Sequence, residues 1–474
     1  MITKSAFMDW CECSKGAWLA RYEPHRMVAG KVSAFDRMLA RDGYAVEDAV
    51  RDWVSGWPDA EDCSFQVVFS DGRFEARADL VRTVADGGID IFEIKSSSSV
   101  RRSGRDQLVD LTFQTVVARR SGHQVRGASI MHVDPDYVRG ERLEPDALLV
   151  AVDVTREVNE LAAEVEAKMM EAAHHFSLVD IDRSGCDCRY RSASSRCAAF
   201  AYLNPDIGPD SAHVLPRISA KRLQMLDGEG RLAIGDVREA DVTTHQLPVL
   251  QAFHDGRPVI DHEGIAAFLQ PLAWPLTFYD YETFASAVPI ATGLSPHRQL
   301  PVQFSAHVLH EDGRLEHHEH LSPAPGLHDA LVDALVASLP AFGSVIVWNE
   351  SFEKSCNRRL CEHLPERRPF LEDLNNRTVD LMLPFRAHYV DHRFGGSVSI
   401  KNVLPVVCPH LAYDETAVHD GAGAMEAWLE MFETEDVRRR SDLDVQLRRY
   451  CALDSFAMVE IFRFLKNVVA APAG

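Results

Sequence analysis

The sequence predicts an α/β protein with two larger domains and a small helical segment between them. Three observations predict this class: the length, the composition and the order of the hydrophobic patterns. With 474 residues the chain exceeds one ordinary domain and can form two or three separate cores. Hydrophobic residues make up 46% and charged residues 26%, which is typical of a globular protein. We expect domains at 1–203 and 271–474, with a helical adaptor at 204–270.

The first domain is predicted to begin with a helix and to continue as a strand-rich region. The apolar pattern predicts strands at Phe65–Phe69, Phe74–Val84 and Ile89–Lys95. A helix at Asp106–Arg120 and a strand at Gly127–Val133 follow. The first domain should therefore combine a sheet with at least two helices.

The rest of the chain is predicted to hold the adaptor and a second α/β domain. Short helices punctuated by Pro and Gly indicate the adaptor. The second domain opens with the strands LTFYDYET and VQFSAHVL and continues with the apolar strand SVIVWN and a helix from about Ser351. A long helix near Val445–Leu465 ends it. Strands that alternate with helices after an initial meander indicate an α/β layer.

Charge and composition narrow the possible partners and location. The formal net charge of −21 argues against a protein that coats nucleic acid, because phosphates are attracted by positive fields. The negative charge does not exclude enzymes whose carboxylates bind divalent metals, because the metal ions offset much of the local charge. No apolar run reaches the roughly 18 residues that span a bilayer, and the start lacks the features of a signal peptide. We expect a cytoplasmic protein without a membrane partner, whose ten cysteines are reduced thiols or metal ligands.

Three acidic segments of the second domain suggest a metal site. Asp280 and Glu282 are two apart in a strand, so both project from one face. Two carboxylates held that close repel each other unless a divalent cation lies between them. Glu353 lies near the start of a helix, and Tyr450 and Asp454 share one face of another. Taken singly, each has an ordinary alternative as a surface acid or a core tyrosine, so the interpretation depends on all three together.

Taken in order, these segments resemble the DEDD exonucleases of the RNase H-like superfamily. The likeness is to the subclass with a tyrosine four residues before the last acid, and it covers roughly residues 275–466. It implies an RNase H-like fold and two Mg²⁺ or Mn²⁺ ions at the attacking water and the leaving oxygen of a phosphodiester. The resemblance makes Asp280, Glu282 and Asp454 ligands, with Tyr450 orienting the water.

The second acidic position departs from the family pattern. The family usually supplies aspartate there, whereas this chain offers Glu353 as the ligand. Glutamate keeps the charge but moves it by about one methylene, which would alter the metal spacing. Asp380, in TVDLML, is a further candidate ligand, with a strand-end or cap role as the alternative.

A second acidic pattern lies in the first domain. Glu93 and Lys95 share a strand face, and a hairpin through the turn at Asp86–Gly88 could bring Asp79 beside them. An acid pair can hold a metal that activates water, while a neighbouring lysine polarises the scissile phosphate. The alternative is a surface salt bridge, which contributes little. The apolar residues around the pair disfavour it, because an unpaired buried lysine is costly.

This pattern resembles that of the PD-(D/E)XK nucleases, and Gln114 in DLTFQTVVARRSG resembles the glutamine motif of their RecB-like branch. The resemblance implies a restriction-endonuclease-like fold in which these residues form a phosphodiester-cutting site. Many RecB-like nucleases use a further ligand upstream. Glu47 and His25 are the candidates here, although neither lies in a supporting motif.

The cysteines suggest a metal-bound staple that closes the first domain. The RecB-like branch, including CRISPR-associated RecB-like exonucleases, often joins its ends with four cysteines around an iron–sulfur cluster. By this resemblance the four cofactor-binding thiols are Cys13, Cys186, Cys188 and Cys197. Cys11 could replace Cys13. On residue type alone, a [4Fe–4S] cluster and tetrahedral zinc suit four thiolates equally.

Across its length the chain resembles a bacterial family that joins a RecB-like module to a DEDD-type module. The segments MHVDPDYVRG, GGSVSIKNVLP and YCALD carry this likeness. It implies a metal-dependent nuclease acting on nucleic acid, as single-stranded DNA or DNA ends, in repair, recombination or defence. The site of the second domain would be a 3′ to 5′ exonuclease. The alternatives are an RNA exonuclease and a nucleic-acid-binding scaffold with one degenerate site.

Overall fold

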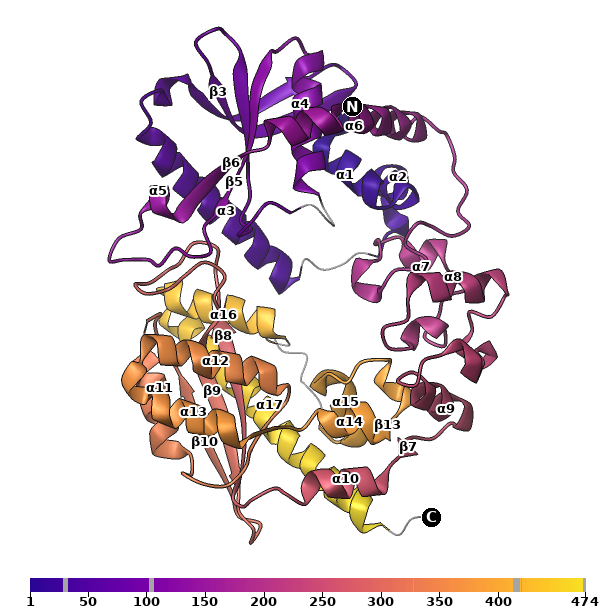
Figure 1. Ribbon diagram of the computed structural model, residues 1–474, viewed down its shortest axis with the longest axis vertical. Coiled ribbons are helices and arrows are strands. Elements are labelled where there is room, and N and C mark those ends of the chain that lie inside the picture. The colour runs from indigo at the N-terminus through magenta and orange to yellow at the C-terminus, as the bar shows by residue number, and fades with distance from the viewer. Residues whose placement is uncertain (29–32, 102–105, 327, 412–417, 419, 472–474) are drawn as a thin grey trace. The chain divides into compact units, whose positions relative to one another are not determined.

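The computed structural model describes residues 1–28, 33–101, 106–326, 328–411, 418 and 420–471, which form a mixed α/β protein (Figure 1). The chain divides into two compact units. The first unit comprises Met1–Ile207 and Ser286–Arg298, and the second comprises Gly208–Ala285 and Gln299–Gly474. The first division falls near the expected boundary at residue 203. The segment expected as an adaptor is grouped with the second unit, and the loop after the LTFYDYET strand is grouped with the first.

The first unit is built on a six-stranded sheet of order β1-β3-β4-β5-β6, in which β2 also pairs with β3. The strands are β1 (Ile2–Thr3), β2 (Cys63–Ser70), β3 (Phe74–Thr83), β4 (Ile89–Ile94), β5 (Val125–Val133) and β6 (Leu149–Asp153). β3 and β4 form the antiparallel hairpin that the sequence predicts, whereas β4 and β5 are parallel. Parallel neighbours need a crossover connection, which here contains the helix α4 (Gln107–Arg120).

The helices of the first unit pack against its sheet and form two separate apolar clusters with it. Besides α4 they are α1 (Lys4–Glu12), α2 (Ser14–Tyr22), α3 (Ala34–Ser55), α5 (Pro145–Leu148), α6 (Thr155–His175) and α7 (Phe200–Leu203). Residues of α1, α2, α4 and α6 share one cluster with the sheet, and α3 joins Leu80 and Phe92 in the other. Most of α4 is buried because it packs against both the sheet and α6.

The second unit is built on a five-stranded sheet of order β10-β9-β8-β11-β12, with β7 and β13 paired separately. The strands are β7 (Val259–Ile260), β8 (Leu276–Phe284), β9 (Leu300–Leu309), β10 (Leu315–Leu321), β11 (Val345–Val347), β12 (Thr378–Asp380) and β13 (Tyr389–Val390). β8, β9 and β10 form an antiparallel meander, and β11 is parallel to both β8 and β12. This is the expected order of a meander followed by strands that alternate with helices.

Helices lie on both faces of this sheet. The helices of the second unit are α8 (Ala220–Gly228), α9 (Leu247–Asp255), α10 (His262–Leu269), α11 (His328–Ser338), α12 (Glu350–His363), α13 (Arg368–Arg377), α14 (Leu383–Ala387), α15 (Ile400–Val407), α16 (Gly421–Glu433) and α17 (Val437–Ala470). Of these, α11, α12, α16 and α17 contact strands of the sheet. In Figure 1, α11, α12 and α13 lie in front of the strands and α17 runs behind them. None of the helices in the described part of the chain has the length and apolar character needed to cross a bilayer.

Alternation along β8 decides which helices its side chains meet. Tyr279 and Tyr281 belong to the apolar cluster of α11, α12 and α13, whereas Phe278 packs against α17 with its ring 5.6 Å from that of Phe462. Because successive strand residues point to opposite faces, Asp280 and Glu282 lie on the α17 side. The fold therefore directs two acids toward the helix that carries the last predicted ligand.

Candidate metal and catalytic sites

The second unit gathers the acids that the sequence singled out. Asp280 and Glu282 place carboxylate oxygens within 4.8 Å of each other and of the Cys451 thiol of α17. One turn of α17 carries both Tyr450 and Asp454, which are 7% exposed. Acids from a strand and a helix that are far apart in the sequence thus converge on one buried position.

The electrostatics of this cluster are those of crowded carboxylates. Burial raises the pKa of Asp280 well above its usual range, and the neighbouring Asp454 raises it further. Burial, Asp280 and Asp454 do the same to the pKa of Glu282. The nearby Lys401 ammonium opposes both shifts. Carboxylates that raise one another's pKa suit a divalent cation, which offsets their charge.

Glu353 provides the clearest test of whether this cluster fits a metal. It lies in the first turns of α12 and is 1% exposed, and its Oε2 atom has no hydrogen-bond partner among the described residues. Burial and then Asp280 raise its pKa well above the usual range. A buried carboxylate oxygen without a partner is costly unless a proton or a cation satisfies it. The donor set of Asp280, Glu282, Glu353 and Asp454 therefore fits a divalent ion.

Asp380 takes the structural role that was the alternative for it. Its Oδ1 atom accepts hydrogen bonds from the backbone N–H groups of Asn349, at 3.1 Å, and Met382, at 2.9 Å. Asn349 adopts a left-handed backbone conformation with φ of 81° at the start of α12. Asp380 thus holds the turn that directs α12, and with it Glu353, toward the acids.

Lys401 is a residue of this site that the sequence analysis did not single out. Its Nζ atom donates to the Tyr450 hydroxyl at 3.2 Å and lies 5.4 Å from the centre of that ring. The two residues are 49 positions apart in the sequence. The segment GGSVSIKNVLP contains Lys401, but no local spacing links it to YCALD.

The first unit brings Asp79, Glu93, Lys95 and Gln114 together as the sequence predicts. Glu93 is 1% exposed and accepts hydrogen bonds from the Lys95 ammonium and from the Gln114 amide. Asp79 Oδ2 accepts from the backbone N–H of Ile94 at 2.9 Å. The hairpin of β3 and β4 thus places the two acids side by side, and α4 delivers the glutamine.

Two further residues complete this cluster, and neither was expected. Lys4 Nζ lies 2.9 Å from Glu93 Oε1 and 3.1 Å from Asp110 Oδ1, and Lys95 Nζ lies 2.8 Å from Asp110 Oδ2. Asp110 stands one helical turn before Gln114, a spacing that could have indicated it. Lys4 is 89 residues from Glu93, and β1 brings it there by pairing with β3.

The charges of the first cluster are largely balanced. Although burial opposes it, Lys95 and Lys4 hold the pKa of Glu93 below its usual value. Burial and the Glu93 carboxylate raise the pKa of Asp79 to about 7. An acid pair beside a lysine can bind a metal and polarise a phosphate. This donor set is compatible with a metal. Because lysines already offset its carboxylates, these acids need a metal ion less than Glu353 does.

The upstream ligand candidates lie elsewhere in the first unit. Glu47 Oε1 accepts hydrogen bonds from Arg51 and Gln66, and His25 lies in an exposed turn. The residue that approaches Glu93 from upstream is Lys4, whose ammonium has no lone pair to offer a metal.

Four cysteines of the first unit form a separate thiol cluster. The sulfur atoms of Cys13, Cys186, Cys188 and Cys197 all lie within 4.8 Å of one another. Cys11 is exposed and is outside this group, so its suggested substitution for Cys13 is wrong. The Asn204 amide donates to Cys186 Sγ at 3.2 Å. Four thiols at this spacing could bind a metal.

Gly16 fits closely against these thiols. A Cβ atom at this position would lie 3.2 Å from both Cys13 Sγ and Cys197 Sγ, and the Gly16 backbone N–H donates to Cys13 Sγ at 3.4 Å. Contacts below about 3.4 Å require the neighbour to move. The start of α2 is therefore shaped to the sulfur cluster.

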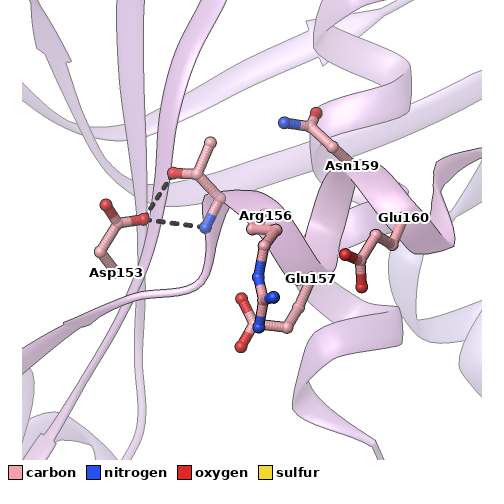
Figure 2. A pocket seen from close by; sticks show the side chains of 6 residues that line it. Asp153, Arg156, Glu157, Asn159 and Glu160 are labelled. Atoms are coloured by element: carbon pink, nitrogen blue, oxygen red, sulfur yellow. Dashed lines mark hydrogen bonds between the residues drawn. The ribbon is translucent and has the colours of Figure 1, made fainter.

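A surface hollow in the first unit lies where β6 leads into α6 (Figure 2). It is lined by Asp153, Thr155, Arg156, Glu157, Asn159 and Glu160. The Asp153 carboxylate accepts hydrogen bonds from the Thr155 hydroxyl and from its backbone N–H at 2.8 Å. These bonds hold the β6–α6 turn, which is a structural role.

Comparison with known proteins gives one family match. A family model described as a domain of unknown function, DUF2779, matches residues 277–399. The matched region includes Asp280, Glu282 and Glu353 and ends before Lys401, Tyr450 and Asp454. No curated protein matches the chain. The matched region thus contains nearly all of the second unit's five-stranded sheet and three of the four acids of its cluster.

Proposed function

We propose that the protein is a metal-dependent nuclease with two active sites, and that the second unit is a 3′ to 5′ exonuclease acting on single-stranded DNA. One observation carries this proposal: Asp280 and Glu282 lie close enough to Asp454 and Glu353 for the acids to raise one another's pKa, and Glu353 Oε2 is buried with no partner among the described residues. Such an arrangement is costly as a structural feature and suited to Mg²⁺ or Mn²⁺.

In this proposal each residue of the second unit has a defined task. The four carboxylates would hold two divalent ions, which would supply Lewis-acid stabilisation of the phosphodiester oxygens. Tyr450 would orient the attacking water, because its hydroxyl lies on the same helical face as Asp454. The meander followed by parallel strands supports an RNase H-like assignment of this unit.

We assign the first unit as a PD-(D/E)XK nuclease of the RecB-like kind. Asp79 and Glu93 would bind a divalent metal, Lys95 would polarise the scissile phosphate, and Gln114 would hold the Glu93 carboxylate in place. Asp110 and Lys4 would keep the charges balanced when substrate is absent.

The four-cysteine cluster is proposed as the staple of the first unit, holding a [4Fe–4S] cluster or zinc. It joins α2 to the segment that contains Cys186–Cys197, so it links the beginning of the unit to its end. Protein purified without oxygen should be brown if the cluster is iron–sulfur. A colourless protein containing about one zinc per chain would replace that assignment with zinc, and a preparation without bound metal would contradict the staple.

The test of the exonuclease uses end-labelled single-stranded DNA and RNA with Mn²⁺. We compare wild type with the pairs Asp280→Ala with Asp454→Ala and Glu93→Ala with Lys95→Ala. The control is Asp442→Ala, an exposed acid on α17. A ladder of DNA shortened from the 3′ end should be lost in the first pair and persist in the second pair and in the control.

Other results would select the alternatives. Degradation of RNA with DNA left intact would make the second unit an RNA exonuclease. Substrates that bind to wild type and remain whole would favour a scaffold with degenerate sites. Residual cleavage that survives loss of Asp280 and Asp454, and disappears with Glu93 and Lys95, would assign activity to the first unit.

A further inference from the structure

Lys401 is fixed in place by contacts on both sides of it in the sequence. It is the second residue of α15 and is half-buried. The Trp348 indole N–H donates to the Val398 carbonyl at 3.2 Å, and the Asn402 amide donates to the Phe394 carbonyl at 3.1 Å. Trp348 directly precedes the turn into α12, so the segment carrying Lys401 is tied to the element that delivers Glu353.

The ammonium of Lys401 interacts with two kinds of partner. It donates to the Tyr450 hydroxyl oxygen at 3.2 Å, and it stabilises the ionised forms of Asp280 and Glu282. A surface lysine would gain little from such contacts. Here the partners are the phenol and two of the acids of the candidate site.

We propose that Lys401 is a positioning residue that sets the direction of the Tyr450 hydroxyl. This inference rests on the proposed exonuclease activity and adds a residue to it. A phenol oxygen carries one proton and can also accept hydrogen bonds. Because Lys401 has only donors, it must occupy an accepting position of the oxygen, and the phenol proton then points away from it. In the proposed exonuclease, the hydroxyl held in this direction engages the attacking water.

The role predicts a specific kinetic pattern. In Lys401→Met the side chain keeps its bulk and loses the donor, so the phenol can rotate away from the water. We expect kcat to fall about 10- to 100-fold, within the range of single proton-handling groups, while KM changes less than about threefold. Lys401→Arg keeps a donor and should recover most of the loss.

A double-mutant cycle distinguishes action through Tyr450 from other roles. Substitutions of groups that act as a unit have non-additive effects. Lys401→Met should therefore lower kcat by less than about threefold when it is introduced into Tyr450→Phe. Lys354→Met is the matched control, because this half-buried lysine of α12 pairs with Glu350 on its own helix. It should keep wild-type kcat.

A second readout does not depend on cleavage. Mn²⁺ affinity, measured by electron paramagnetic resonance, should stay within about tenfold of wild type in Lys401→Met, because the four acids remain. Additive losses in the cycle, a wild-type kcat in Lys401→Met, or loss of Mn²⁺ binding would each overturn the positioning role. If wild type itself leaves DNA and RNA intact, the proposed exonuclease fails and this role fails with it. If wild type is active, Tyr450→Phe is slow and Lys401→Met is unaffected, only the present inference fails.

Discussion

Two buried glutamates show how the two acid clusters differ at the scale of single residues. Glu93 accepts hydrogen bonds from Lys4, Lys95 and Gln114. Glu353 is equally buried, yet its Oε2 atom has no partner among the described residues. Burying a carboxylate is tolerable when cations and donors surround it and costly when they do not. The first cluster should therefore be stable as it stands, and the second should gain much more from a metal.

Neutralising one acid of the second cluster should reveal this dependence. Asp280→Asn removes a charge at nearly constant size, so repulsion among Asp280, Glu282 and Asp454 falls. In EDTA we expect the melting temperature of the second unit to rise by about 2–4 °C. With Mn²⁺ wild type should have the higher melting temperature, since it gains binding free energy and the variant gains less.

Scanning calorimetry with and without Mn²⁺ measures both effects. Asp442→Asn, at an exposed acid of α17, is the control and should follow wild type in both conditions. Equal stabilisation of wild type and Asp280→Asn by Mn²⁺ would show that Asp280 is not a ligand.

Removing a positively charged side chain from the first cluster should lower stability, the opposite of the effect expected for Asp280→Asn in EDTA. Lys4→Met leaves Glu93 and Asp110 with one counter-charge fewer, and Glu93 is almost fully buried. We expect a loss of about 1–2 kcal/mol in the free energy of unfolding, reduced from a fully buried pair because Lys4 is partly exposed. Urea unfolding measures it. Lys168→Met, which removes an exposed helical pair with Glu164, should cost less than about 0.5 kcal/mol. A similar loss for both variants would contradict the importance of the Lys4 contacts.

At the scale of elements, the short connection between α1 and α2 carries the sulfur cluster. Cys13 caps α2, and Gly16 in its first turn leaves room for the thiols. Gly16→Ala should push a methyl group against Cys13 and Cys197 and displace them. We expect bound iron or zinc to fall at least about threefold, since a metal site needs its ligands within a few tenths of an ångström.

Metal analysis of the purified protein is the measurement. Gly43→Ala is the matched control, because a Cβ there has no neighbour within 4 Å and the position lies in the middle of α3. It should keep its metal and gain up to about 1 kcal/mol of stability. Full metal content in Gly16→Ala would mean that the thiols accommodate the methyl group, and would contradict the requirement for glycine at this position.

Elements with a clear local pattern were predictable, and contacts between distant elements were not. The β3–β4 hairpin and the strand β8 follow from period-two alternation and turn residues within about twenty positions. Lys4 and Lys401 approach their partners across 89 and 49 residues through sheet pairing and helix packing. A single sequence carries no local signal for such pairs. Asp110 is intermediate, because its spacing from Gln114 was visible but its burial beside Lys95 was not.

At the scale of the whole molecule, the charge balance constrains how nucleic acid can bind. Seventy-one acidic residues face fifty basic ones, so long-range electrostatics repel a polyanion. The proposed nuclease must therefore recruit its substrate locally, at the acid clusters once divalent ions have offset their charge. The affinity for DNA should then depend strongly on divalent ions and weakly on monovalent salt.

This dependence can be measured with fluorescently labelled single-stranded DNA by anisotropy, using Ca²⁺ to permit binding with little cleavage. We expect Ca²⁺ to tighten binding at least about tenfold over EDTA, because it offsets the acids that otherwise repel the phosphates. A plot of the logarithm of affinity against that of NaCl concentration should have a slope shallower than about −3, since each displaced counterion contributes about −0.7 for a single strand. The Asp280→Ala and Asp454→Ala pair should lose the Ca²⁺ effect that Asp442→Ala retains. A slope of about −6 in EDTA would instead mean that a basic surface, and not the metal-loaded acids, brings the substrate to the protein.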